Sequence, residues 1–190
     1  ALGQVWTPFA GVRLDGIWNS PNLSSGPNTF ARNLGVTDPQ DNFFGRAMPA
    51  IGLEYRFPLV ANTSWGTHII EPIAQIVARP NEARSGNLPN NDALSLTFDD
   101  TNIFDWNKFS GYDRVEGGVR ANIGAQYTFH MNGGGYANVL VGQSYQLAGR
   151  NSYARWDLAN TGAQSGLDRR ASDFVARAVY APNANVSFFA

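Results

Sequence analysis

Residues 115–131 read VEGGVRANIGAQYTFHM and carry the clearest structural signal in this sequence. From Val115 to Met131 every second residue is apolar or glycine, whereas the residues between them include Glu116, Arg120 and His130. An alternation with a period of two residues is typical of a β-strand with one apolar and one polar face. Strands of globular proteins usually have about 5–6 residues, so a strand over 115–131 is long for a soluble sheet.

The same alternation, less regular, predicts further strands on both sides of this stretch. In 69–80, for example, Ile70, Ala74 and Ile76 alternate with Glu71 and Gln75. Residues 186–189, VSFF, have the composition of a strand that is cut short. The sequence therefore predicts about seven long strands, at 6–18, 50–59, 69–80, 115–131, 136–147, 173–181 and 186–189.

Short and long connections alternate between these predicted strands. The short ones, at 60–67, 132–135 and 182–185, are rich in glycine, asparagine and other turn formers. The long ones, at 19–45, 81–112 and 148–171, are polar. Outer-membrane barrels have short turns at one end and long loops at the other. The expected fold is accordingly all-β: a sector of an antiparallel transmembrane β-barrel.

A secreted β-sandwich is the main alternative, because its strands also alternate apolar and polar residues. Three features favour the barrel. The strands are long enough to cross a bilayer, which takes about 9–11 residues. Aromatic residues such as Trp6 and Trp18 lie near strand ends on the apolar side, as in interfacial girdles. Polar side chains recur in mid-strand on the other side and are expected to face a wet lumen: Glu54, Arg56, Glu71, Gln75, Arg79, Glu116, Arg120, Asn122 and Gln126.

Composition excludes several classes of protein. The 14 basic and 15 acidic residues give a net charge of −1, which argues against a nucleic-acid partner. Cysteine is absent, so disulfide frameworks and thiol catalysis are excluded. No apolar run approaches the length of a transmembrane helix, and no signal peptide opens the chain. An open sheet edge in lipid is costly, so we expect the 190 residues to be one part of a larger barrel.

Residues 98–114, FDDTNIFDWNKFSGYDR, place aromatic, acidic and turn-forming residues at specific positions. The motif residues are Asp99, Asp100, Thr101, Asn102, Phe109, Ser110, Gly111, Tyr112, Asp113 and Arg114. Together with EP at 71–72, ARPNE at 78–82, GQSY at 142–145 and DRRASD at 168–173, they resemble the LptD family of lipopolysaccharide (LPS) assembly proteins. The resemblance covers most of residues 45–182 in the order of the family's motifs.

The resemblance implies a translocon that assembles LPS into the outer leaflet of the Gram-negative outer membrane. It implies a barrel of about 26 strands, within the known range, and a periplasmic jelly-roll domain that residues 1–190 lack. The implied partners are LPS, outer-membrane lipid, the plug lipoprotein LptE and the periplasmic bridge protein LptA. The cysteines of the family are absent here. No cofactor or metal is expected, and no enzymatic activity.

Other readings of the same residues stay open. A porin-like or receptor barrel for small solutes is the alternative function. A hydrolase built on Ser64 and His68 lacks a nucleophile-elbow motif, and His130 is expected to be a solvated interface residue. Calcium binding by the loop acids Asp92, Asp99, Asp100 and Asp105 lacks the EF-hand spacing. The arginines on the polar side could bind LPS phosphates, but ion pairs with the glutamates on the same side are favoured.

Overall fold

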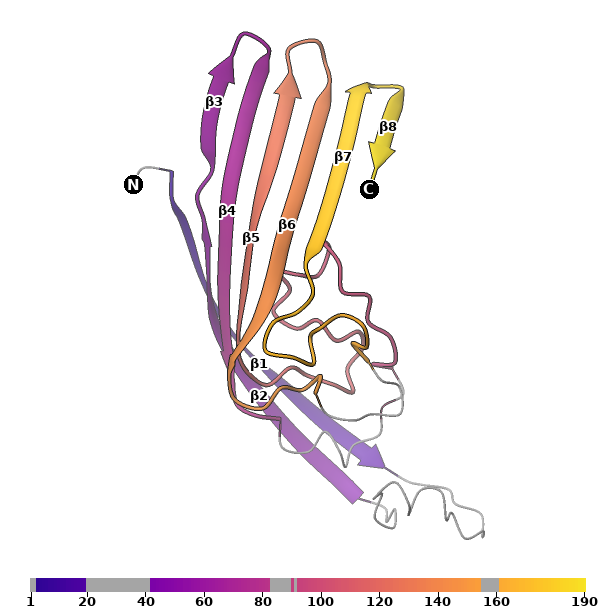
Figure 1. The fold of residues 1–190 in the computed structure, drawn as a ribbon. Coiled ribbons are helices and arrows are strands. Elements are labelled where there is room, and N and C mark those ends of the chain that lie inside the picture. Colours follow the sequence, from indigo (N-terminus) through magenta and orange to yellow (C-terminus); the bar gives the residue numbers. More distant parts are fainter. Residues whose placement is uncertain (1–2, 20–41, 83–89, 91, 155–160) are drawn as a thin grey trace.

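A computed structural model describes residues 3–19, 42–82, 90, 92–154 and 161–190 of the chain. These residues form a single antiparallel sheet of eight strands (Figure 1). The strands are β1 (Val5–Asn19), β2 (Asn42–Arg56), β3 (Leu59–Thr63), β4 (Gly66–Arg79), β5 (Gly118–Met131), β6 (Tyr136–Ala148), β7 (Val175–Asn183) and β8 (Val186–Phe189). The order across the sheet is β1-β2-β4-β5-β6-β7-β8, and β3 pairs with β4.

Strands β2 and β3 are two parts of one long strand. Both pair with β4 in the same register, from Ile51 opposite Ala78 to Thr63 opposite Gly66. The interruption falls at Phe57-Pro58, opposite Pro72, and proline cannot donate a ladder hydrogen bond. Strand β4 runs unbroken through Pro72 and ends at Arg79, directly before Pro80.

Three boundaries differ from the sequence prediction. The strand predicted at 50–59 begins at Asn42, so residues 42–45 of the predicted link are strand. The prediction of a link at 60–67 is wrong, because most of this segment is strand and the turn contains only Ser64 and Trp65. The strand at 115–131 begins later, at Gly118. Gly118 has a φ of +79°, which leaves the extended conformation, and a Cβ on Gly117 would lie 2.8 Å from the backbone nitrogen of Glu82. Val115 and Glu116 therefore belong to the preceding loop. The predicted link 19–45 lies mostly outside the described residues.

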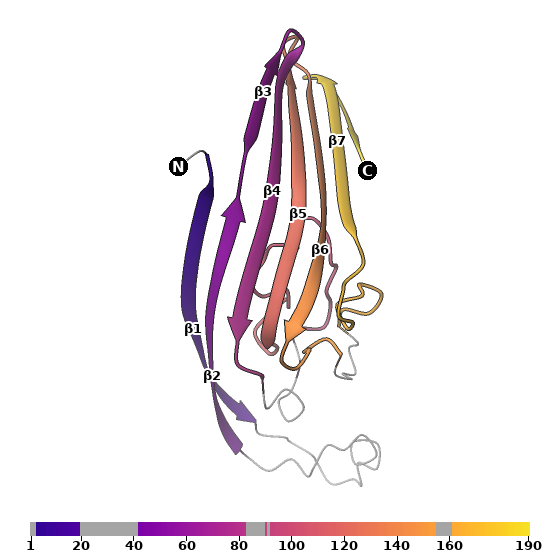
Figure 2. The same cartoon turned by 60° about the vertical axis from the view of Figure 1, so that its left-hand side comes forward.

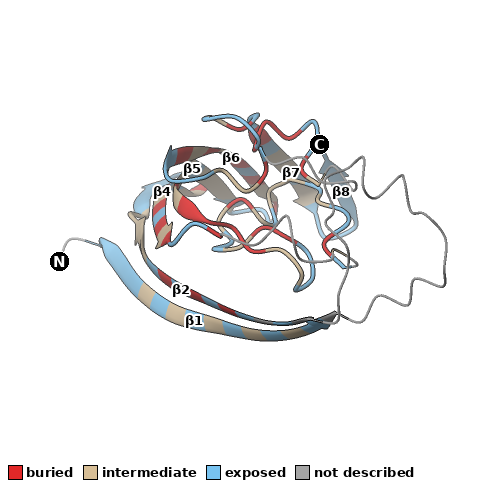
Figure 3. Ribbon diagram, turned by 90° about the horizontal axis from the view of Figure 1, so that it is seen from below, coloured by how far each residue is buried: buried red, intermediate tan, exposed pale blue. Residues whose placement is uncertain are grey.

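The two faces of the sheet have the reverse of the burial found in a soluble protein. On the outer face, Leu14 is 72% exposed and Ile51 is 64% exposed. On the inner face, Asn122, Asn138 and Ser144 are 0% exposed. The described parts of the links after β4 and β6, residues 92–117, 149–154 and 161–174, pack against this inner face, inside the curve of the sheet (Figures 1 and 3).

The described sheet is open, because β1 and β8 each have one neighbouring strand. The all-β, antiparallel part of the predicted fold is confirmed, whereas closure into a barrel stays a prediction. The described residues contain no helix, and hence none that is long and apolar enough to span a membrane.

Candidate functional site: the polar inner face of the sheet

The inner face divides into two halves along the strands. The half nearer the long links is covered by residues 92–117, 149–154 and 161–174, and we call it the covered half (Figure 2). Its polar residues, Gln75, Arg79, Arg120, Asn122, Ser144 and Gln146, are all at most 8% exposed. The half nearer the tight turns, which we call the open half, carries mostly half-buried or exposed polar residues: Arg56, Glu71, Gln126, Thr128 and His130. Asn138, opposite Thr128, is the exception: it is 0% exposed and accepts a hydrogen bond from Arg177 of β7.

A row of hydrogen bonds crosses four strands where the two halves meet. Glu54, Gln75, Asn122 and Ser144 lie directly opposite one another on β2, β4, β5 and β6. Gln75 Nε2 donates to Glu54 Oε2 at 3.0 Å, and Asn122 Nδ2 donates to Gln75 Oε1 at 2.7 Å. Ser144 Oγ donates to Asn122 Oδ1 at 2.6 Å. Because these buried groups satisfy one another, the row fixes the register of the strands.

Glu116 anchors to the covered half the two long links that follow β4 and β6, which we call the first and the second long link. Its carboxylate lies 3.1 Å from Arg120 Nε and 3.9 Å from Arg79 Nη1. It also accepts hydrogen bonds from the backbone N–H of Lys108 at 2.6 Å and from the Tyr153 hydroxyl at 2.9 Å. One carboxylate thus joins two strands, the first long link through Lys108 and the second through Tyr153.

The electrostatics of this cluster favour an ionised Glu116. Burial opposes its ionisation, but the positive charges of Lys108, Arg120 and Arg79 outweigh burial and lower the pKa of Glu116. Burial lowers the pKa of Lys108, and the neighbouring arginines add to this effect against the attraction of Glu116. Burial and the adjacent Glu116 charge raise the pKa of Tyr153 well above its usual range, so its hydroxyl stays a donor.

Residues 103–106 run across the inner face from β6 to β1. Ile103 packs on Gly142 of β6, where a Cβ would lie 2.5 Å from Ile103 Cδ1. The ring of Phe104 lies over Gly124 of β5, and its carbonyl accepts a 2.7 Å hydrogen bond from Gln75 of β4. Trp106 lies over Gly11 of β1. We call residues 103–106 the strap, since they hold the first long link against four strands of the sheet, β6, β5, β4 and β1.

The motif at 99–102 shapes the turn that precedes the strap. Asp99 Oδ1 accepts hydrogen bonds from the backbone N–H and the hydroxyl of Thr101, at 2.9 and 2.6 Å. Asn102 Oδ1 accepts from the Asp99 N–H at 3.2 Å, and its amide donates to the carbonyl of Thr97. Asp100 pairs with Arg177 of β7 at 2.9 Å. These residues have structural roles at the sheet surface.

The motif at 109–114 attaches the same link to β1 and β2. Asp92 accepts hydrogen bonds from the N–H groups of Tyr112 and Asp113, at 2.7 and 2.8 Å. Arg46 of β2 donates to the carbonyls of Tyr112 and Asp113, at 2.7 and 2.9 Å, and Arg13 of β1 lies over the Tyr112 ring. The remaining motif residues are placed nearby: Phe109 stacks on Tyr153, Ser110 donates to Ser95, Gly111 has a φ of +71°, and Arg114 lies beside Asp113.

The predicted ion pairs on the polar side are present. In the open half, Arg56 lies 2.7 Å from Glu54 and 3.8 Å from Glu71. Gln126, also on this half, lies opposite Glu71. Glu116 needs a correction, because it lies in the loop before β5 and is fully buried there instead of facing an open lumen. Arg79 and Arg120 are on the predicted side, but the long links cover them.

Sequence reasoning missed several residues that complete the site, namely Arg46, Lys108, Trp106, Ser144 and Tyr153. Arg46 lies between the predicted link 19–45 and the predicted strand 50–59, in a part of β2 that was not predicted as strand. Lys108, Trp106 and Tyr153 lie in loops, which have no periodic pattern that could place them. One signal was available: Gly124 and Gly142 interrupt the polar side of two neighbouring strands at directly opposite positions. A pair of glycines on one face indicates a close approach by another segment.

The residues considered for the other candidate activities lie in different environments. His68 is on the outer face, stacked on Phe129, with its ring nitrogens 2.8 Å from the Tyr127 hydroxyl and 3.2 Å from the Thr63 hydroxyl. Ser64 lies in the neighbouring turn. His130 is exposed beside Tyr136. Within the described ranges, no group of three or more acidic or histidine side chains could hold a metal ion.

Comparison with known proteins gives one finding about the family. The family model LptD, described as LPS transport system D, matches residues 1–190. A search of curated proteins finds no match.

Proposed function

Because the chain belongs to the LptD family, whose members act in LPS transport at the outer membrane, we propose that its sheet is a sector of a transmembrane β-barrel that assembles LPS into the outer leaflet. The outer face would contact lipid, and the inner face would line the path of the saccharide. The observation that carries this proposal is the reversed burial of the sheet, with apolar side chains exposed and polar ones turned inward.

Elementary physics supports the barrel. Unpaired backbone groups in a bilayer cost several kcal/mol each, so a lipid-embedded sheet of this kind needs further strands beside β1 and β8. Strands of 13 to 15 residues, such as β1 and β6, exceed the about 9–11 residues that cross a bilayer. The exposed aromatic residues Trp6, Trp18 and Tyr180 lie near strand ends, where an interfacial girdle is expected.

The open half is the part of the inner face that suits a moving saccharide. Its side chains offer both donors and acceptors, and the ion pairs of Arg56 leave little net charge on the wall. Such a wall forms many exchangeable hydrogen bonds without a single strong site. The role is transport without bond chemistry, and the complete system would include LptE, LptA and an external source of energy. The family match gives no support to a porin-like role.

Depletion of the protein in cells tests this function. We expect newly made LPS to disappear from the outer leaflet and to accumulate behind it, and we expect the wild-type protein to restore delivery. Surface labelling of pulse-labelled LPS is the measurement. Normal surface LPS together with impaired uptake of small solutes would contradict the proposal.

A further inference from the structure

Four aromatic residues form a line across the outer face of the sheet, on the side of the tight turns. They are Trp6 on β1, Tyr55 on β2, Tyr127 on β5 and Tyr180 on β7. The rings of Trp6 and Tyr55 lie with their centroids 4.4 Å apart. Tryptophan and tyrosine gather where a bilayer meets water. The course of this line over the strands therefore carries information on how the sheet is oriented in a membrane.

The line is oblique to the hydrogen-bonded rows of the sheet. We call a row of residues that lie directly opposite one another on neighbouring strands a rung. The rung that starts at Trp6 continues through Tyr55, Ala74, Ile123 and Gln143. On β5, Tyr127 lies four residues from Ile123. On β7, Tyr180 pairs with Ala137, which lies six residues from Gln143 along β6. Both displacements are toward the tight turns.

The size of the displacement gives a tilt for the strands. Three steps from strand to strand lead from β1 to β5, and five lead from β1 to β7. Displacements of four and six residues therefore correspond to about 1.2–1.3 residues per strand. With about 3.3 Å per residue and about 4.8 Å between strands, this slope belongs to strands tilted by about 40°. The strands of outer-membrane barrels are tilted by about 35–45°.

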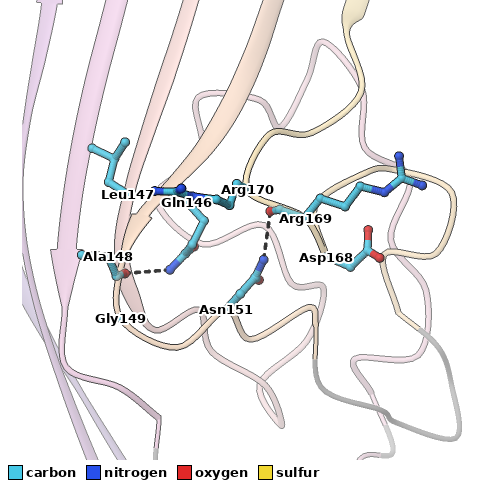
Figure 4. A pocket seen from close by; sticks show the side chains of 8 residues that line it. All are labelled: Gln146, Leu147, Ala148, Gly149, Asn151, Asp168, Arg169 and Arg170. Carbon is cyan, nitrogen blue, oxygen red and sulfur yellow. Dashed lines mark hydrogen bonds between the residues drawn. The ribbon is translucent and has the colours of Figure 1, made fainter.

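The side of the long links fits the same tilt, since a tilted strand crosses a bilayer in about 9–11 residues. About ten residues from Tyr127 lead to Gly118, where β5 begins, and about ten from Tyr180 lead to Arg170. There the chain still pairs with β6, because the carbonyl of Arg170 accepts a 2.8 Å hydrogen bond from the N–H of Gln146. Figure 4 shows Arg169 and Arg170 beside the end of β6. Both are exposed, and a charge inside hydrocarbon is costly.

From these positions we propose that the bilayer boundary on the side of the tight turns follows the line from Trp6 through Tyr55 and Tyr127 to Tyr180. Residues of one rung then lie at different depths in the membrane. Exposed apolar side chains on the long-link side of the line contact lipid hydrocarbon, among them Ile51, Ile123 and Val141. The proposal rests on the proposed function for the presence of a bilayer, and deepens it by giving the sheet an orientation.

The same boundary leaves the tip of the β3–β4 hairpin outside the hydrocarbon. Leu59 lies four residues beyond Tyr55, and every residue of β3 is exposed. The outer face here carries a polar network, in which the ring nitrogens of His68 lie 2.8 Å from the Tyr127 hydroxyl and 3.2 Å from the Thr63 hydroxyl. Burial of such groups in hydrocarbon is costly. An oblique boundary places this network among headgroups and water.

The test measures the depth of a fluorescent amino acid, placed at one position at a time in the full-length protein in phosphatidylcholine vesicles. Lipids with bromine near the headgroup or near the acyl-chain end quench it from known depths. Labels at Trp6, Tyr127 and Tyr180 should be quenched most by the shallow bromines. A label at Ile123, on the rung of Trp6, should be quenched most by the deep ones, with a ratio that differs by about twofold or more.

A second rung gives the matched control. It joins Leu59 to Ala178 through Ile70, Tyr127 and Val139. Iodide on both sides of the vesicles should quench a label at Leu59, which lies outside the line, and leave a label at Ala178 unquenched. Slow cleavage at Lys108 by a Lys-specific protease verifies that each labelled protein is folded.

Equal depths at Trp6 and Ile123, or equal iodide quenching at Leu59 and Ala178, would mean that the boundary follows the rungs and would overturn the proposal. Delivery of LPS to the surface, measured separately, keeps this result apart from the proposed function. A protein that delivers LPS with equal depths along a rung contradicts only the oblique boundary. If brominated lipid quenches none of the labels, the membrane-embedded sheet of the proposed function is contradicted as well.

Discussion

The covered and open halves of the inner face belong to the same strands, with the same alternation of apolar and polar residues, yet their polar residues have different roles. In the covered half, Glu116, Arg79 and Arg120 are almost inaccessible and hold loops. In the open half, Arg56 and Glu71 pair on a surface that stays partly exposed. The alternation along a strand places a charged side chain on the inner face. Whether that side chain anchors a loop or lines an open surface depends on whether a loop packs over it.

Replacement of Glu116 should have the largest effect on this difference. E116Q leaves Arg79, Arg120 and Lys108 buried without their shared carboxylate, and breaking a buried ion pair costs about 3–5 kcal/mol. The sequence has one lysine, so cleavage at Lys108 by a Lys-specific protease reports opening of the covered half. We expect cleavage to accelerate by about a hundredfold or more.

The matched control for this variant is E71Q in the open half. Glu71 lies 3.8 Å from Arg56 and its side chain is 22% exposed, and exposed pairs contribute about 0–1 kcal/mol. Cleavage at Lys108 should stay within a few-fold of wild type. Equal effects of E116Q and E71Q would mean that the two halves do not differ as described.

Removal of the strap's buried anchor should have the next largest effect. Ile103 is 0% exposed, and truncation of a buried isoleucine to alanine costs about 2–5 kcal/mol. In I103A we expect hydrogen exchange of the backbone amides at 103–117 to rise by more than tenfold. The control I123A truncates an outer-face residue that is 53% exposed, and should leave this exchange unchanged. Similar exchange in the two variants would show that the strap does not hold the first long link against the sheet.

Acid should loosen the covered half through Glu116. Its folded-state pKa lies below the usual 4.5, so its ionised form adds stability that is fully present above pH 4.5. This stability is lost as the pH falls through the lower folded-state value. After correction for intrinsic rates, exchange at 103–117 should rise below pH 4.5. The rise should be absent in E116Q, and a rise of the same size in that variant would assign the acid sensitivity to other groups.

The smallest effect is expected at the rim of the covered half. Asp100 and Arg177 pair at 2.9 Å, but the Arg177 side chain is 38% exposed, and such pairs contribute about 0.2–1 kcal/mol. A double-mutant cycle with D100N and R177Q, read by cleavage at Lys108, should give a coupling in this range. A coupling above about 2 kcal/mol would show that the rim holds the loops as firmly as Glu116 does.

Most of the sheet could be predicted from the sequence, because alternation along a strand is a local property. The strand bounds at β6 and β8 and the inward direction of Gln75, Asn122 and Arg120 follow from it. The boundary at Gly118 could not be placed, since apolar and polar residues continue to alternate through Val115 and Glu116 after the backbone leaves the strand. The packing of the two long links over the inner face could not be predicted either, because it depends on long-range contacts between Lys108, Glu116 and Tyr153.

The central claim, that the open half lines the path of LPS, is tested most directly by photocrosslinking from three positions on β5. A photoreactive residue replaces Gln126 in the open half, Asn122 in the covered half or Ile123 on the outer face. In cells, the account predicts LPS adducts at Gln126 that disappear when ATP is depleted. It predicts none at Asn122, and adducts at Ile123 that persist without ATP because they come from the surrounding bilayer. The absence of LPS adducts at Gln126 in cells that deliver LPS normally would contradict it.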